Sequence, residues 1–268
     1  MSDTAFVGSI PELYERYMVP MIFAPYARDM AARVAAAKPA AVLETAAGTG
    51  VLTRALAAEL PPEAELTATD LNQAMLDEAR RRLPERAVRW QQADALALPF
   101  EDGAFDVVAC QFGAMFFPDK PAAYAEARRL LREDGRFFFS VWDRIEENHF
   151  VHVIQRELDA LFPEEPPRFM PRIPHGYFDG EQIAAQLRAG GFTAAPRIEP
   201  LAFTARAPSA HDAAFGYCQG TPLRAELERL GPDALARATD AAAAALRRRY
   251  GDGPIEGQIR AWVVEAAR

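Results

Sequence analysis

Between residues 38 and 142, short apolar runs alternate with amphipathic stretches, and this alternation constrains the fold more than any other feature of the sequence. Strands that alternate with helices at this spacing form right-handed β-α-β units and therefore a mostly parallel sheet. The apolar runs agree with this, because the central strands of such a sheet are buried on both faces. The predicted strands are 40–46, 65–69, 87–91, 104–110 and 136–142, and the predicted helices between them are 50–60, 72–83 and 119–132.

After residue 142 the regular alternation of predicted strands and helices ends. A helix is predicted over 148–162, and the five prolines of 163–174 predict a stiff connection without regular structure. A helix that begins after Asp179, a strand over 197–205, a mostly helical stretch over 209–249 and an apolar strand over 259–266 complete the chain. We therefore expect an N-terminal helical segment at 1–37, a core at 38–208 with a proline-rich insertion at 145–178, a helical cap at 209–254 and a last core strand at 255–268.

The composition of the chain disfavours several classes of partner. The chain has 30 Lys and Arg against 38 Asp and Glu, a net charge of −8, which disfavours nucleic acid and anionic membranes. No signal-peptide pattern and no apolar run of membrane-spanning length is evident, so we expect a cytoplasmic protein without membrane insertion, a monomer or a homodimer. Cys110 and Cys218 have neither metal-type spacing nor a disulfide framework, and no metal site is predicted.

The most informative stretch is VLETAAGTG, from Val42 to Gly50. Here a predicted strand leads into a turn of small residues, and a helix follows. Small residues let the backbone pass close to a ligand, and the first turn of a helix presents unpaired N–H groups. A tight turn that binds nothing is the alternative interpretation.

Polar side chains follow the next predicted strands. Asp70 ends the second strand, where a carboxylate can accept hydrogen bonds from a ribose diol or cap the following helix. Asp94 follows the third strand and can accept from an exocyclic amine, although a solvated loop residue is the simpler interpretation. Gln111 and Phe112 follow the fourth strand. Open α/β sheets bind ligands at these strand ends, so the row predicts a pocket for a nucleoside with a charged tail.

Two nucleoside classes compete for such a pocket. A dinucleotide site requires G-x-G-x-x-G, and counted from Gly48 its third glycine falls on Thr53. An NAD(P)-dependent oxidoreductase is therefore the weaker alternative. A non-catalytic module that binds a metabolite and regulates a partner is the alternative from a different class.

Four segments carry a resemblance to a known family: VLETAAGTG, TATD, QQADALALPFEDGAFDVVACQFGAMFFPD and LLREDGRFFFSVWD. They resemble the successive motifs of class I S-adenosylmethionine (SAM)-dependent methyltransferases, and more closely the branch that includes ubiquinone- and menaquinone-biosynthesis enzymes. The resemblance is strong over 38–142 and weaker over 1–37 and 170–192. It implies a Rossmann-like, doubly wound, seven-stranded and mostly parallel sheet with a helical cap. It also implies SAM as cofactor and S-adenosylhomocysteine (SAH) as product.

The resemblance assigns roles at the methionine end of SAM. Glu44 would orient this end directly or through water, and an N-terminal helix carrying Tyr14 and Tyr17 would close over the cofactor. The family's first glycine is Ala46 here, and its extra methyl is compatible with binding unless the position requires a positive φ. Backbone contacts are implied for Ala46, Gly48 and Gly50.

At the nucleoside end, the resemblance assigns Asp70 to the ribose hydroxyls and Leu71 to the face of the adenine. Asp94 would contact the adenine amine, and Ala95 would contact the ring through its backbone. Gln111 would lie under the ribose and the methionine portion.

The reaction requires an in-line arrangement of nucleophile, methyl and sulfur, and a general base where the acceptor is a hydroxyl. Candidate catalytic side chains are His149, His175 and Tyr17, although a single histidine is more often structural. The acceptor is expected to be a small, partly apolar organic molecule. Its predicted pocket is formed by Phe112, Met115, Phe116, Trp142 and residues 175–178.

Overall fold

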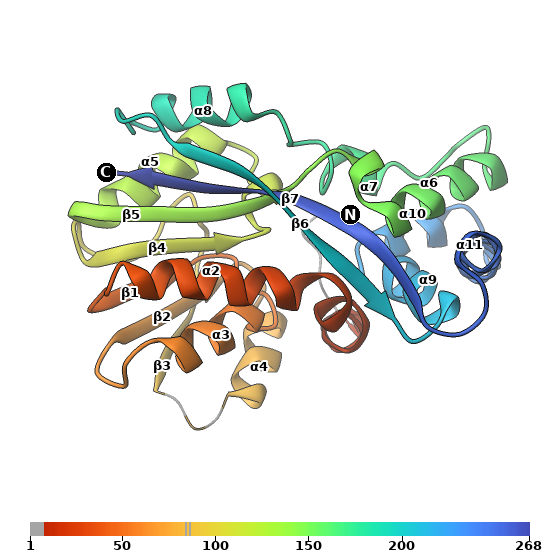
Figure 1. Cartoon of the computed structure of the whole chain (residues 1–268), viewed down its shortest axis with the longest axis horizontal. Coiled ribbons are helices and arrows are strands. Elements are labelled where there is room, and N and C mark those ends of the chain that lie inside the picture. The colour runs from red at the N-terminus through yellow and green to blue at the C-terminus, as the bar shows by residue number, and fades with distance from the viewer. Residues whose placement is uncertain (1–7, 84, 86) are drawn as a thin grey trace. The chain divides into compact units, whose positions relative to one another are not determined.

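The computed structural model describes residues 8–83, 85 and 87–268 (Figure 1). The chain divides into two compact units. The sheet unit comprises Pro25–Val141, Tyr177–Leu201 and Ala261–Arg268. The helical unit comprises Met1–Ala24, Trp142–Gly176 and Ala202–Arg260. The domain boundaries expected from the sequence stay predictions.

The sheet has seven strands in the order β3-β2-β1-β4-β5-β7-β6 (Figure 1). The strands β1 to β5 are parallel in all four of their pairings. β7 runs antiparallel to β5, because Arg268 N donates to Gly135 O at one end and Asp143 N donates to Arg260 O at the other. The predicted seven-stranded, mostly parallel sheet is confirmed. The strands are β1 (Ala41–Glu44), β2 (Glu65–Asp70), β3 (Val88–Gln92), β4 (Phe105–Gln111), β5 (Leu131–Trp142), β6 (Arg197–Ala207) and β7 (Ile255–Ala267).

In the sheet unit, both faces of the sheet are covered by helices. Phe138 of β5 belongs to a buried cluster with α2 and α3, whereas its neighbours Phe137 and Phe139 pack against Tyr124 of α5. Successive strand residues point to opposite faces, so this alternation buries the apolar run on both sides. The helices concerned are α2 (Ala24–Ala36), α3 (Val51–Glu59), α4 (Gln73–Arg82), η2 (Ala114–Phe116), α5 (Lys120–Leu130) and α8 (Gly180–Ala189).

The helical unit is built around close packing of helices on α9. A Cβ at Gly216 of α9 would lie 3.0 Å from Tyr17 Cβ, so the absence of a side chain allows the N-terminal helix to approach. The helices of this unit are α1 (Ile10–Leu13), η1 (Tyr14–Phe23), η3 (Ile145–Glu147), α6 (His149–Leu161), α7 (Phe169–Arg172), α9 (Ala210–Gln219), α10 (Leu223–Arg229) and α11 (Ala234–Tyr250).

Two local predictions are wrong. The proline-rich stretch 163–174 contains the one-turn helix α7, which Pro171 permits because the first turn of a helix leaves its N–H groups unpaired. Strand β5 begins at Leu131 instead of Arg136, since its register with β4 jumps from Phe105–Leu131 to Val107–Arg136. Residues 132–135 lie within this irregularity.

The N-terminal helical segment has an unexpected geometry. Residues Tyr14–Phe23 form a π-helix, which contains Pro20. A proline ring inside an α-helix collides with the carbonyl of the fourth residue before it, and the wider π turn relieves that collision.

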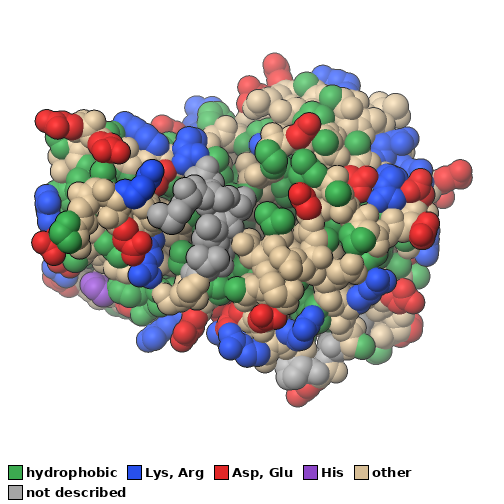
Figure 2. All heavy atoms as spheres, turned by 180° about the vertical axis from the view of Figure 1, so that it is seen from behind, with side chains coloured by type: hydrophobic (Ala, Val, Ile, Leu, Met, Phe, Trp, Pro, Cys, Tyr) green, Lys and Arg blue, Asp and Glu red, His purple; other side chains and the backbone are tan. Residues whose placement is uncertain are grey.

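The described residues contain no helix long and apolar enough to cross a membrane. Lys and Arg side chains are intermingled with Asp and Glu over the face in Figure 2. No group of three or more potential metal ligands is found among the described residues.

Candidate functional site

The carboxylate of Glu44, the last residue of β1, is buried at the start of the small-residue turn. Its Oε2 accepts a hydrogen bond of 2.5 Å from Oγ1 of Thr53, which lies in the first turn of α3. Burial raises the pKa of Glu44 to about 8, against the lowering effect of the Thr53 hydrogen bond. A buried carboxyl of this kind favours a cationic neighbour, because a positive charge would stabilise its ionised form.

The turn after β1 uses left-handed backbone conformations at alternate residues: φ is 53° at Ala46, 56° at Gly48 and 78° at Gly50. The positive φ that would disfavour alanine at position 46 is therefore present. A Cβ at Gly48 would have no heavy atom within 4 Å, so the space beside this backbone is open. A Cβ at Gly50 would lie 2.9 Å from Ala79 Cβ, so this glycine allows close packing of α3 and α4.

Asp70, the last residue of β2, joins two turns. Its Oδ2 accepts from Gly48 N and its Oδ1 from Asn72 N, both at 2.8 Å. Burial raises the pKa of Asp70 above its ordinary value, while these backbone hydrogen bonds act in the opposite direction. Asn72 Nδ2 also donates to Oδ1 at 3.5 Å, whereas Oδ2 can accept a second hydrogen bond from a ligand hydroxyl. The N-cap of α4 is Asn72, so Asp70 is not the helix cap.

Leu71 is 48% exposed and is the one large hydrophobic side chain classed as exposed in the described part of the chain. It directly follows the buried Asp70. Such an apolar surface beside a carboxylate matches an adenosine, whose base is flat and apolar on its faces and whose ribose carries two hydroxyls.

Asp94 and Gln111 lie at the ends of the neighbouring strands. Asp94 follows β3, is exposed, and accepts from Leu96 N at 2.9 Å through Oδ1; Ala95 beside it is partly buried. Gln111 is the last residue of β4 and is buried. Since β3, β2, β1 and β4 are adjacent and parallel, the carboxyl ends of these strands form one edge of the sheet unit. The structure therefore places all the predicted cofactor residues of the sheet unit along this edge: Glu44, Ala46, Gly48, Gly50, Asp70, Leu71, Asp94, Ala95 and Gln111.

In the helical unit, the two predicted tyrosines have different neighbours. The ring of Tyr14 lies 5.0 Å from that of Phe23, whereas Tyr17 lies 5.2 Å from Phe215. The π geometry, with more residues per turn than an α-helix, separates side chains that an α-helix would align. Tyr14 begins a row of rings, because Phe23 lies 5.7 Å from Trp142 and Trp142 lies 6.1 Å from His175.

His175 is buried, and its Nδ1 lies 2.8 Å from the carbonyl oxygen of Asp143. A carbonyl oxygen can only accept, so Nδ1 carries the hydrogen. Burial lowers the pKa of His175 to about 4, which keeps the ring neutral near pH 7. Nε2 therefore presents a lone pair, as a hydrogen-bond or proton acceptor requires.

The carbonyl that orients His175 belongs to a network that the sequence analysis missed. Asp143 pairs with Arg260 Nε at 3.0 Å, and Arg260 N donates to Asn148 Oδ1 at 3.1 Å. Asn148 is itself 2% exposed. Arg260 is more than 100 positions from Asp143 and Asn148 in the sequence, and no local pattern connects it with them.

His149, by contrast, is exposed, and its Nδ1 accepts from Gln258 N at 3.2 Å. This bond holds the start of α6 against β7. The geometry is that of a structural histidine, and it does not resemble the buried neutral ring of His175.

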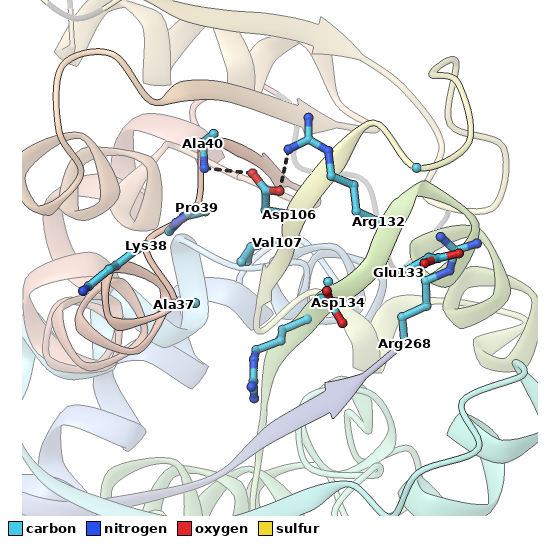
Figure 3. A pocket seen from close by; sticks show the side chains of 13 residues that line it. Ala37, Lys38, Pro39, Ala40, Asp106, Val107, Arg132, Glu133, Asp134 and Arg268 are labelled. Atoms are coloured by element: carbon cyan, nitrogen blue, oxygen red, sulfur yellow. Dashed lines mark hydrogen bonds and ion pairs between the residues drawn. The ribbon is translucent and has the colours of Figure 1, made fainter.

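A pocket of about 780 Å³ lies at the opposite edge of the sheet unit, where β1, β4 and β5 begin (Figure 3). Asp106 there accepts from Ala40 N and pairs with Arg132 Nη1 at 2.5 Å. This carboxylate is thus used to fix the starts of strands, and the pocket contains none of the predicted site residues.

The strand order and the polar edge define a doubly wound α/β protein with a nucleoside-type site. Comparison with known proteins adds the family. Residues 42–135 match a family model described as a methyltransferase domain. The chain is 31% identical over 177 residues to a demethylmenaquinone methyltransferase from Deinococcus radiodurans. The matched region covers 62% of this chain and 73% of that protein.

The chain is also 39% identical over 117 residues to the ubiquinone/menaquinone biosynthesis C-methyltransferase UbiE from Burkholderia mallei. The matched region covers 41% of this chain and 48% of that protein. Among solved structures, a putative methyltransferase from Bacillus halodurans superposes with a TM-score of 0.55 at 18% identity, covering 90% of this chain and 97% of that one. The latter likeness concerns the fold alone.

The chain therefore belongs to the class I SAM-dependent methyltransferases, in the branch that includes ubiquinone- and menaquinone-biosynthesis enzymes. SAM is accordingly its cofactor, which decides against the nicotinamide alternative. The residues along this edge fit SAM. Gly48 leaves open space beside the backbone, Leu71 offers an exposed apolar surface, and Glu44 offers a buried carboxyl whose ionised form a cation would stabilise.

Proposed function

We propose that this methyltransferase acts on a small, partly apolar aromatic acceptor that carries a hydroxyl group. The observation that carries the proposal is the row of rings from Tyr14 through Phe23 and Trp142 to the neutral imidazole of His175. Aromatic side chains favour flat, apolar ligands, and a neutral imidazole provides an acceptor for a hydroxyl. The names of the two relatives, a demethylmenaquinone methyltransferase and a ubiquinone/menaquinone biosynthesis C-methyltransferase, support a quinone-type aromatic acceptor.

We also propose the cofactor roles expected from the family motifs. Asp70 binds the ribose hydroxyls with the lone pairs that its backbone hydrogen bonds leave available, and Leu71 packs on the adenine. Glu44 binds near the cationic methionine end of the cofactor. Asp94, Ala95 and Gln111 line the same edge, and the backbone at Ala46, Gly48 and Gly50 completes it.

The bound cofactor supplies an electrophilic methyl group and a positive charge that is lost on transfer. The acceptor hydroxyl would donate a hydrogen bond to Nε2 of His175. Its proton would move to this nitrogen as the acceptor forms its new bond to the methyl carbon and the methyl–sulfur bond breaks. The positive charge then resides on the imidazolium, so the total charge of the site is conserved. The hydrogen bond from Nδ1 to Asp143 O holds the ring in the tautomer that this step requires.

His175 is thus the favoured catalytic histidine, and His149 and Tyr17 are the weaker candidates. His149 is committed to Gln258 N, and Tyr17 packs on Phe215 with Arg16 above its ring.

The proposal is tested by methyl transfer from radiolabelled SAM to a set of phenols, hydroquinones and their oxygen-free analogues. Hydroxylated aromatic acceptors should be methylated and the analogues should not. His175→Gln should lower kcat by at least about tenfold and leave the dissociation constant of SAM unchanged, while the matched His149→Gln should retain kcat. Transfer to aliphatic amines but to no phenol or hydroquinone would contradict the acceptor class.

A further inference from the structure

The side chain of Thr53 is directed at the carboxyl of Glu44. Thr53 lies in the first turn of α3 and is 0% exposed. Its Oγ1 donates to Glu44 Oε2 at 2.5 Å, and its backbone N–H also favours the ionised form of this carboxyl. Thr53 is too deeply buried to contact a ligand. Any part that it plays in cofactor binding must therefore act through Glu44.

The charged groups around Glu44 do not neutralise it. Arg54 of α3 acts on the carboxyl only through space, and its Nη1 donates to Thr49 O at 2.8 Å. Asp70, at the end of the neighbouring strand β2, has the same charge as Glu44 and opposes its ionisation. The thiol of Cys110 on β4 is neutral, because burial raises its pKa to about 12. With a pKa of about 8, Glu44 is therefore mostly protonated at pH 7.

A protonated Glu44 creates a conflict with its proposed partner. The methionine end of the cofactor is cationic, and a cation attracts the ionised carboxylate rather than the neutral acid. The carboxyl must therefore lose its proton when the cofactor arrives. Inside the protein no bulk water stabilises the new negative charge, so fixed donors have to do so. The hydroxyl and the N–H of Thr53 are donors already in place.

We propose that Thr53 is a positioning residue that enables Glu44 to exchange its proton for the cationic cofactor, so that cofactor binding releases one proton. This inference rests on the proposed role of Glu44. The O–H bond of the carboxyl breaks and its proton passes to the solvent. The negative charge that remains is shared between the donors of Thr53 and the cation of the cofactor. Since the ionised form binds, the affinity for SAM should rise with pH until Glu44 is ionised in the free protein, near pH 8.

The first test counts the released protons. SAM is titrated into the full chain by calorimetry at about pH 6.5, in phosphate and in imidazole, two buffers with different ionisation enthalpies. An α-amino group stays protonated at this pH, so the cofactor itself releases nothing. The wild type should release close to one proton per SAM, and Glu44→Gln should release none.

The outcomes of this test separate the inference from the role on which it rests. If the wild type releases no proton and Glu44→Gln weakens SAM binding, the inference is overturned and the cofactor role of Glu44 stands. If Glu44→Gln changes neither the affinity nor the number of protons, both the role of Glu44 and the inference are contradicted.

The second test isolates the hydroxyl of Thr53. Thr53→Val keeps the volume of the side chain and removes the donor. It should weaken SAM binding about tenfold at about pH 6.5 and move the pH at which the affinity stops rising upward by about one unit. Thr53→Ser, which restores the donor, should return both values to those of the wild type. The amino group of the cofactor contributes equally to every profile, so differences between variants report the protein.

Thr69→Val is the matched control. Thr69 is 1% exposed, and its Oγ1 donates to the backbone carbonyl of Glu44 at 3.1 Å instead of to the carboxyl. This variant loses a buried hydroxyl next to the same residue and should keep the wild-type pH profile. If the profile of Thr53→Val coincides with that of Thr69→Val, the role of Thr53 is merely structural and the inference is overturned. Thr53→Ala removes the same donor and decides the question if the valine variant does not fold.

Discussion

The close approach of two turns at the cofactor edge allows a quantitative prediction. Gly113 follows β4 and has an ordinary φ of −97°, yet a Cβ added there would overlap Ala46 Cβ and lie 2.8 Å from Cys110 Sγ. Gly113→Ala should therefore be destabilising by about 2 kcal/mol through overpacking, which is about 4–8 °C in Tm for a chain of this size.

The same substitution should cost less when the methyl group of Ala46 is absent. Ala46→Gly alone should be nearly neutral, because relief of the left-handed conformation, about 1 kcal/mol, offsets the greater freedom of glycine in the unfolded chain. In this background Gly113→Ala retains only the contact with Cys110 Sγ. We expect a coupling free energy of about 1–1.5 kcal/mol between the two positions.

The assay is urea unfolding of the wild type, both single variants and the double variant, without cofactor. Gly180→Ala serves as the matched control, because the nearest heavy atom to its Cβ would be Ile198 Cγ2 at 3.8 Å; it should not be destabilising. A coupling free energy within 0.3 kcal/mol of zero, at the roughly additive level of independent sites, would refute the steric reasoning.

Three further predictions concern the cofactor edge. The pKa of Glu44 is about 8 in the folded protein and 4.5 in its ordinary, unfolded environment. The buried neutral carboxyl therefore contributes its full stability below pH 4.5, and this stability is lost as the pH rises through 8. Glu44→Gln should therefore gain stability over the wild type across this window, by up to about 5 kcal/mol in urea unfolding, and a pH-independent difference would contradict the burial argument. Asp70→Ala should weaken SAM binding by about 2–3 kcal/mol in calorimetry, and an unchanged dissociation constant would exclude the ribose role. Gly48→Val should abolish SAM binding by filling the open space at a positive φ; normal titration by a folded variant would argue against close approach of the cofactor.

The sheet was predictable because its signals are local. Apolar runs at regular spacing predict buried parallel strands, and Phe137 to Phe139 illustrate how such a run is covered on both faces. The edge from Glu44 to Gln111 followed from the same topology, since neighbouring parallel strands end together. Capping chemistry was equally local: Asp119 accepts from Ala122 N, and Asp179 accepts from Glu181 N.

What could not be predicted depends on contacts between distant parts of the chain. No local sequence pattern distinguishes His149 from His175. Only the fold exposes His149 and buries His175 beside Asp143. The π-helix around Pro20 has no recognised sequence signal, because the proline alone indicates a kink or a break. The positive φ of Ala46 is likewise set by its surroundings, against the preference of alanine.

The carboxylate of Asp70 has a consequence for how the cofactor is assembled in its site. One of its oxygens holds Gly48 N, in the turn assigned to the methionine half, while the carboxylate itself is assigned to the ribose. Any small movement of this side chain toward a nucleoside is therefore transmitted to the backbone that meets the amino-acid half. Free adenosine and free homocysteine, offered as separate fragments, should each improve the affinity for the other, a cooperativity that a site made of two independent halves would lack.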